Sequence, residues 1–139
     1  VVVGLASDGD PLKLAAVGKQ IAMHVAAADP GAVSRDQMDP AEVDRERRIL
    51  ADQARSSGKP ENIIEKMVEG RLRKFFEESC LLEQTYVIDG ESKVSNILEE
   101  AGKDAGGAIT VTGFHRFKLG EGVDRKKEDF AAEVAAAAN

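Results

Sequence analysis

The order of apolar and polar positions at the start of the chain predicts a strand followed by a helix. Residues 1–5 are mostly β-branched and apolar, which is typical of a strand. Turn residues follow, and Asp10 and Pro11 suit the cap and the first position of a helix. A second, short strand is predicted at residues 32–34. The helix has one apolar stripe, formed by Leu14, Val17, Ile21, Val25 and Ala28.

Residues 39–80 have the pattern of two amphipathic helices separated by a tight turn. Gly58, which adopts a left-handed conformation easily, and Pro60, which fits the start of a helix, mark that turn. The first helix has few apolar positions, so we expect it to be poorly buried. The second has a continuous stripe of Ile64, Val68, Leu72 and Phe75. The segment therefore predicts an antiparallel helical hairpin, a coiled coil, that projects into solvent.

The rest of the chain predicts two more strands and two more helices. Residues 83–89 have the composition of a strand and end at an Asp-Gly turn signal. Residues 94–101 predict a short helix with Ser92 as a candidate cap, and residues 109–119 alternate loosely in the manner of a strand. Residues 129–138 are rich in alanine and predict a terminal helix.

Together these elements predict an α+β fold in which helices pack on a small antiparallel sheet. Residues 1–38 and 81–120 are expected to form one discontinuous core subdomain. Residues 39–80 would be the hairpin inserted into it, and residues 121–139 a C-terminal helical module.

Charge and composition narrow the class of protein. The chain has 139 residues, with 19 Lys and Arg against 25 Asp and Glu and a formal net charge of −6. An acidic chain is poorly suited to binding a phosphate backbone, so we expect no direct nucleic-acid contact. Its one cysteine, Cys80, excludes an internal disulfide and favours a reducing cytoplasm. No apolar run is long enough to span a membrane.

The side chains that usually carry catalysis are scarce. His24 and His115 are the two histidines, and neither lies in a metal-binding spacing. The chain has no glycine-rich phosphate-binding loop, and Cys80 lies among apolar neighbours, where a core role is expected. We therefore expect a binding or regulatory module without a metal or cofactor, and not an enzyme.

Three segments, taken together, are specific for one family. They are Lys-Gln-Ile-Ala-Met-His-Val-Ala-Ala at 19–27, Ser-Gly-Lys-Pro through Glu-Lys-Met-Val-Glu-Gly-Arg at 57–71, and Val-Thr-Gly-Phe through Asp-Phe-Ala-Ala-Glu-Val-Ala at 111–135. In order and spacing the whole chain resembles the C-terminal part of bacterial elongation factor Ts. The resemblance implies a protein that promotes GDP release from elongation factor Tu. It also implies a coiled-coil hairpin inserted in the second of two α+β subdomains, followed by a terminal helical module.

One family motif is missing from the chain. The resemblance implies a Thr-Asp-Phe-Val motif, which supplies the phenylalanine that intrudes near the magnesium site of elongation factor Tu. This sequence does not contain it, and the Asp-Phe at 129–130 belongs to a different context. We therefore expect the chain to be a piece of a longer protein that keeps binding surfaces but lacks this wedge.

The resemblance assigns partner-binding roles to five residues: His24, Val87, Ile88, Phe130 and Val134. His24 lies about 60° from Ile21 around the helix, at the rim of the apolar stripe, which suits a half-exposed contact, although a hydrogen-bonded structural histidine fits equally well. Val87 and Ile88 would face the third domain of elongation factor Tu, or would be ordinary core residues of a strand. Phe130 and Val134 would contact its nucleotide-binding domain.

A second reading of the chain comes from another class of function. The hairpin could make this a purely structural association module that forms homodimers or docks a different protein. Binding to elongation factor Tu distinguishes the two readings.

Overall fold

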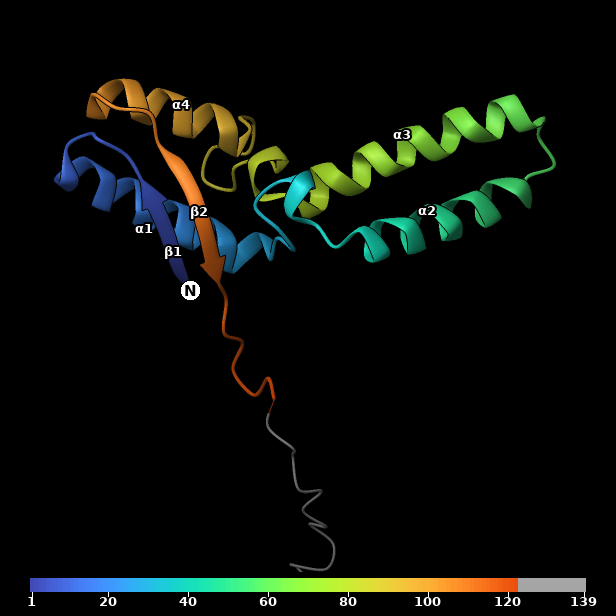
Figure 1. The fold of residues 1–139 in the computed structure, drawn as a ribbon, viewed down its shortest axis with the longest axis horizontal. Coiled ribbons are helices and arrows are strands. Elements are labelled where there is room, and N and C mark those ends of the chain that lie inside the picture. Colours follow the sequence, from blue (N-terminus) through green and yellow to red (C-terminus); the bar gives the residue numbers. More distant parts are fainter. Residues whose placement is uncertain (123–139) are drawn as a thin grey trace, which may run out of the picture.

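The computed structural model describes residues 1–122 and gives an α+β fold, as the sequence predicts (Figure 1). Its helices and strands follow in the order β1 (Val2–Ala6), α1 (Pro11–Ala28), η1 (Arg35–Gln37), α2 (Pro40–Arg55), α3 (Glu61–Ser79), η2 (Leu81–Glu83), α4 (Val94–Ala105) and β2 (Thr110–His115). The elements η1 and η2 are single turns of 3₁₀-helix.

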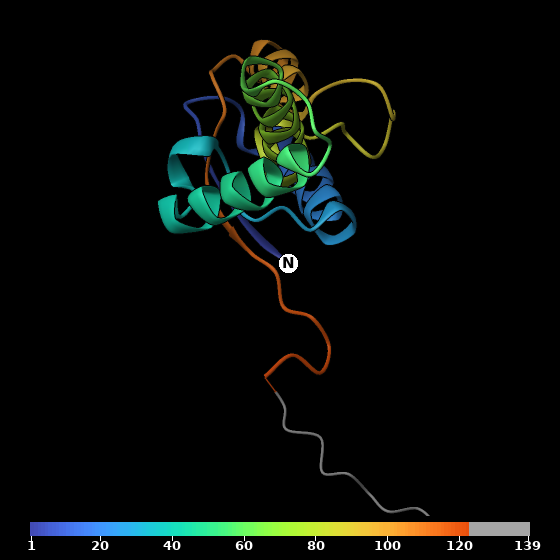
Figure 2. The same ribbon diagram turned by 90° about the vertical axis from the view of Figure 1, so that its right-hand side faces the viewer.

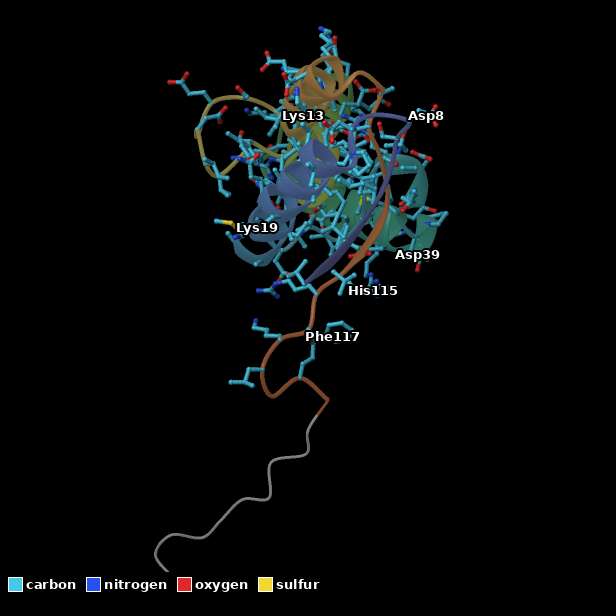
Figure 3. All side chains as sticks on the ribbon, turned by 90° about the vertical axis from the view of Figure 1, so that its left-hand side faces the viewer. Asp8, Lys13, Lys19, Asp39, His115 and Phe117 are labelled. Carbon is cyan, nitrogen blue, oxygen red and sulfur yellow. The ribbon has the colours of Figure 1, made fainter. Side chains whose placement is uncertain are left out.

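The sheet consists of β1 and β2, which pair antiparallel although they lie at opposite ends of the described chain. The register pairs Val2 with His115 and Leu5 with Val111, with an irregularity between Gly4 and Leu5. Pairing ends at His115, so the strand predicted for 109–119 is shorter than expected. Beyond it, Phe117 lies on a segment that leaves the helices (Figure 3).

One apolar core holds α1, α4 and one face of the sheet together. It contains Ile21 and Val25 from the predicted stripe of α1, with Val94 and Leu98 from α4 and Val111 from β2. Residues from the segments on either side of the hairpin complete it: Val33, Leu81 and Tyr86. Residues 1–38 and residues 81–120 therefore both contribute side chains to this core. They can do so because the two ends of the inserted hairpin lie close together.

The helices α2 and α3 pack side by side and point away from the sheet (Figure 1). Asp39 caps α2 by accepting a hydrogen bond from the Ala41 amide at 2.9 Å, and Gly58 has the expected positive φ of 68°. Few side chains are buried between the helices: Leu50, Ala54, Ile64 and Leu72. The antiparallel hairpin is thus present, while its supercoiling as a coiled coil stays a prediction.

Two strand predictions were wrong. Residues 83–89 do not form a strand: η2 ends at Glu83, and the only ladder contact in the segment is one bridge from Thr85 to Lys93. The chain turns instead, because the Gly90 amide donates to the Tyr86 carbonyl at 2.8 Å. Residues 32–34 likewise contribute a single parallel bridge, between Ala32 and Cys80.

The cap predicted for the helix after this loop was also wrong. Lys93, and not Ser92, is the N-cap residue of α4, and it makes no side-chain cap bond. The first amide of the helix, that of Val94, donates to the backbone carbonyl of Gln84 at 3.1 Å. The backbone carbonyl of Gln84 therefore accepts a hydrogen bond from the start of α4, where the Ser92 hydroxyl was expected to do so.

Two glycines bring the turn before α1 against the turn after α4. A Cβ added at Gly107 would lie 2.7 Å from the Gly9 amide nitrogen, closer than real side chains approach backbone. The Asp10 amide donates to the Ala105 carbonyl at 2.9 Å in the same contact. This close approach fixes the ends of the two helices that cover the sheet.

We expect Gly107→Ala to destabilise the chain by about 1–3 kcal/mol, because the clash is with backbone and the packed turns must separate. Gly70→Ala is the matched control: nothing lies within 4 Å of its added Cβ, and it is inside α3. There alanine should stabilise by about 0.5–1 kcal/mol. Urea unfolding followed by circular dichroism measures both changes, and equal effects of the two substitutions would contradict the packing argument.

Candidate functional site

The sequence-predicted site residues that the structure describes meet at one loop, formed by residues 84–93. It connects η2 to α4 and stands away from the body as the yellow segment of Figure 2. Its tip is shaped by Asp89, whose carboxylate accepts the amides of Glu91 at 3.0 Å and Ser92 at 3.1 Å. These bonds hold the pKa of Asp89 below its usual value.

Val87 and Ile88 lie on the outside of this loop. Their exposed fractions are 46% and 53%, which is high for two adjacent β-branched apolar residues. The alternative that they are core strand residues is therefore wrong. Since both side chains face solvent in the described chain, they are available for contact with another molecule.

Of the two readings of His24 that the sequence left open, the structure agrees with the hydrogen-bonded structural histidine. The expected half-exposed position is wrong, because the side chain is completely buried. The loop covers this flank of α1, with the ring of Tyr86 stacked at 5.8 Å from the ring of His24. Helical spacing within α1 gave no sign of this cover, since the covering residues are about 60 positions away in sequence.

Both ring nitrogens of His24 are hydrogen-bonded. Nε2 lies 2.8 Å from Oε1 of Gln84, and Nδ1 lies 3.2 Å from the backbone nitrogen of Val87. Gln84 is itself buried and donates from Nε2 to the Glu78 carbonyl at 2.7 Å. A buried polar network thus connects α1, the end of α3 and the backbone of the exposed pair.

Sequence reasoning missed Gln84 and Tyr86. The available signal was an uncharged polar side chain within the largely apolar stretch from Cys80 to Ile88. A buried amide needs hydrogen-bond partners, so such a residue indicates a local network. Its partner on α1 could not be read from the sequence.

An ion pair fastens the base of the hairpin beside this network. Arg35 of η1 donates from Nε and Nη2 to the two carboxylate oxygens of Glu83 in η2, and its guanidinium lies 4.6 Å from the centre of the Phe76 ring. The hydrogen bonds from Arg35 hold the pKa of Glu83 below its usual value. Nearby, burial raises the pKa of the Cys80 thiol, which agrees with a core role.

This ion pair predicts an acid-dependent loss of stability. The pKa of Glu83 is lower in the folded chain than its ordinary value of 4.5. Its ionised carboxylate therefore stabilises the fold fully above pH 4.5, and this stabilisation is lost as the pH falls through the lower pKa of the folded state. We expect Glu83→Gln to lower the thermal midpoint at pH 7, and the difference from the unsubstituted chain to shrink towards pH 3. Melting curves across this range test it, and a difference that stays constant would contradict the assignment.

Phe130 and Val134 lie outside the described residues. Within residues 1–122, no group of three or more His, Cys, Asp or Glu side chains is arranged to hold a metal ion. In that same part of the chain, no helix is both long enough and apolar enough to cross a membrane.

Comparison with known proteins places the chain in a family. The sequence model described as Elongation factor TS matches residues 1–121. The chain is 58% identical over 136 residues to elongation factor Ts of Rhodospirillum rubrum, covering 98% of the chain and 44% of that protein. It is 56% identical over 138 residues to elongation factor Ts of Rhodospirillum centenum, covering 99% of the chain and 45% of that protein. The chain thus spans a little under half the length of these relatives, and it belongs to the elongation factor Ts family.

Proposed function

We propose that the chain is part of a translation elongation factor that binds elongation factor Tu and promotes release of its GDP. The family match over residues 1–121 and the relatives named elongation factor Ts support the role in translation. The cytoplasm, where translation takes place, is the proposed location. The observation that carries the proposed contact is the exposure of Val87 and Ile88 on a projecting loop.

The loop has the features of a protein-binding element. Its apolar pair is exposed, while its backbone is held by the turn at Asp89 and by the bond from Val87 to His24. A loop whose conformation is already fixed loses little conformational entropy on binding. The free energy gained by burying the two apolar side chains is therefore not cancelled by the cost of ordering the loop. Side chains that become fully desolvated in a well-packed pocket near the centre of an interface carry most of its binding energy.

Nucleotide exchange by this route needs no covalent chemistry. A protein that binds nucleotide-free elongation factor Tu more tightly than the GDP-bound form lowers the affinity for GDP by the same factor. The chain would act as a binding partner that shifts this equilibrium. Neither a catalytic side chain nor a cofactor is part of the proposal.

The other predicted contacts enter the proposal differently. Because His24 is buried, it would act through the loop and not by direct contact. Contacts of Phe130 and Val134 with the nucleotide-binding domain of the partner remain proposed from the resemblance alone.

The proposal predicts that Val87→Ala with Ile88→Ala weakens binding to nucleotide-free elongation factor Tu by about 1–3 kcal/mol, the range of interface anchors. Isothermal titration calorimetry at low salt gives the dissociation constants. The matched control is Ile49→Ala with Ile63→Ala, which removes two apolar side chains of similar exposure, 44% and 41%, from the hairpin.

Three results would separate the possible functions. A loss confined to the loop variant supports the proposed contact. Equal affinity of the loop variant and the unsubstituted chain would remove Val87 and Ile88 from the interface. If the unsubstituted chain shows no binding and instead sediments as a dimer, the non-catalytic dimerisation module replaces the exchange factor.

A further inference from the structure

The bond from Val87 to His24 attaches the exposed pair to the body of the protein. Within residues 1–122 it is the only hydrogen bond from the backbone of Val87 or Ile88 to an element outside the loop. The neighbouring bonds close the loop on itself: the Tyr86 amide donates to the Ser92 carbonyl at 2.7 Å, and Gly90 donates to Tyr86. The core contacts of Tyr86 bring the loop against α1, and the Nδ1 nitrogen of His24 is then the one acceptor from α1 that holds the Val87–Ile88 backbone directly.

The partners of His24 determine the tautomer of its ring. A backbone N–H can only donate, so Nδ1 must accept from Val87 and carries no proton. Nε2 then carries the proton and donates to Oε1 of Gln84. The other end of the Gln84 amide fits this assignment, because its Nε2 faces two carbonyl acceptors, those of Glu78 at 2.7 Å and Ala28 at 3.4 Å.

Each member of this chain of bonds orients the next. The carbonyls of α1 and α3 orient the Gln84 amide, the amide oxygen selects the Nε2-protonated imidazole, and the imidazole presents an acceptor to Val87. The His24 and Gln84 side chains are buried and the bonds to Glu78 and Val87 are partly buried, so water replaces a lost partner at a cost. The arrangement is more specific than core packing requires, since an apolar side chain would fill the same space.

We propose that His24 is a positioning residue, which with Gln84 holds the Val87 amide and so sets the conformation in which Val87 and Ile88 are presented to the partner. This inference rests on the proposed function of the loop. It assigns His24 a role without any contact with the partner, and it adds Gln84 to the residues on which binding depends.

Three substitutions of His24 separate positioning from packing. His24→Asn keeps an acceptor near the place of Nδ1 but loses the bond to Gln84, whereas His24→Gln reaches Gln84 but loses the acceptor for Val87. His24→Leu loses both bonds and fills the space with an apolar side chain of similar size. The Asn variant leaves Gln84 without its partner on His24, and the Gln variant leaves the Val87 amide without its acceptor. Since each loses one hydrogen bond, similar losses of stability are expected from the two.

The affinity of each His24 variant for nucleotide-free elongation factor Tu should depend on whether the variant keeps an acceptor for the Val87 amide. It should not depend on how far the substitution lowers the folding stability. We expect His24→Asn to bind within about threefold of the unsubstituted chain, and His24→Gln and His24→Leu to bind at least about tenfold more weakly, roughly 1.4 kcal/mol. In the background of Val87→Ala with Ile88→Ala, His24→Gln should cause no further loss. An affinity order that follows stability, or additive losses, would overturn the positioning role.

Nuclear magnetic resonance of the unsubstituted chain tests the bond itself, even if a variant fails to fold. The nitrogen shift of Nδ1 should be that of an unprotonated nitrogen, and the Val87 amide should exchange slowly although its side chain is exposed. A protonated Nδ1 or a rapidly exchanging Val87 amide would overturn the inference while leaving the proposed interface intact. If the loop double variant binds normally, the proposed interface fails and the inference fails with it.

Discussion

Replacing Leu81 by alanine is expected to cost about 2–5 kcal/mol of unfolding free energy, the range for large-to-small changes in a packed core. Leu81 is completely buried and follows the last helix of the hairpin, where it joins the core formed by α1 and α4. Its amide also donates to the Ala32 carbonyl at 2.9 Å, so the surrounding backbone is held and cannot collapse freely into the cavity. Since small domains are stable by only about 5–15 kcal/mol, much of the population would unfold at moderate temperature.

Leu12→Ala is the control for this prediction. Leu12 is 83% exposed in the first turn of α1, and the same loss of atoms there should change stability by less than about 0.5 kcal/mol. Chemical denaturation of the two variants gives the comparison. A Leu81 variant as stable as the Leu12 variant would show that the segments flanking the hairpin do not share the core.

The second large effect concerns nucleotide release. The 139-residue chain by itself is expected to accelerate GDP release from elongation factor Tu at least about tenfold less than a full-length relative, equivalent to about 1.4 kcal/mol of activation free energy. The resemblance places a wedge, the phenylalanine of a Thr-Asp-Phe-Val motif, near the magnesium site of the partner, and this chain lacks that motif. Binding without the wedge would occupy the partner but disturb its nucleotide site weakly.

Stopped-flow release of a fluorescent GDP measures this difference. Elongation factor Ts of Rhodospirillum rubrum, of which the chain covers 44%, is the reference. Both proteins are used in excess, so that incomplete binding does not lower the observed rate. Release by the chain at the rate of the reference would show that the elements needed for exchange lie within these residues.

Local signals predicted α1, the helices of the hairpin and β1 well because the causes of these elements are local. Asp10 caps α1 through a bond of 2.8 Å to the Leu12 amide, as its position before a proline indicated, and Asp39, also before a proline, caps α2 in the same way. The β-branched start of the chain forms β1, and its partner β2 begins within the predicted segment. In each case, the side chain and the backbone group that it satisfies are within a few residues.

The candidate site was harder to predict because its causes are not local. Val87 lies in a segment with strand composition, yet its amide is taken by His24 from 63 residues away, and the segment turns instead. The loop and the Tyr86 ring bury His24, which helical spacing alone placed at the half-exposed rim of the apolar stripe. A loop that is held by long-range contacts, from Gln84, Tyr86 and Val87 to α1, has no periodic pattern in the sequence, so its exposed pair could be assigned only through the resemblance.

The proposed function requires the chain to bind elongation factor Tu in a manner that is coupled to the nucleotide. The most direct test is calorimetric titration of the chain into nucleotide-free and GDP-bound elongation factor Tu at low salt. We expect binding to both forms, with higher affinity for the nucleotide-free form, and a decrease in GDP affinity by the same ratio when the chain is present. Equal affinity for the two forms, or no binding to either, would contradict the claim.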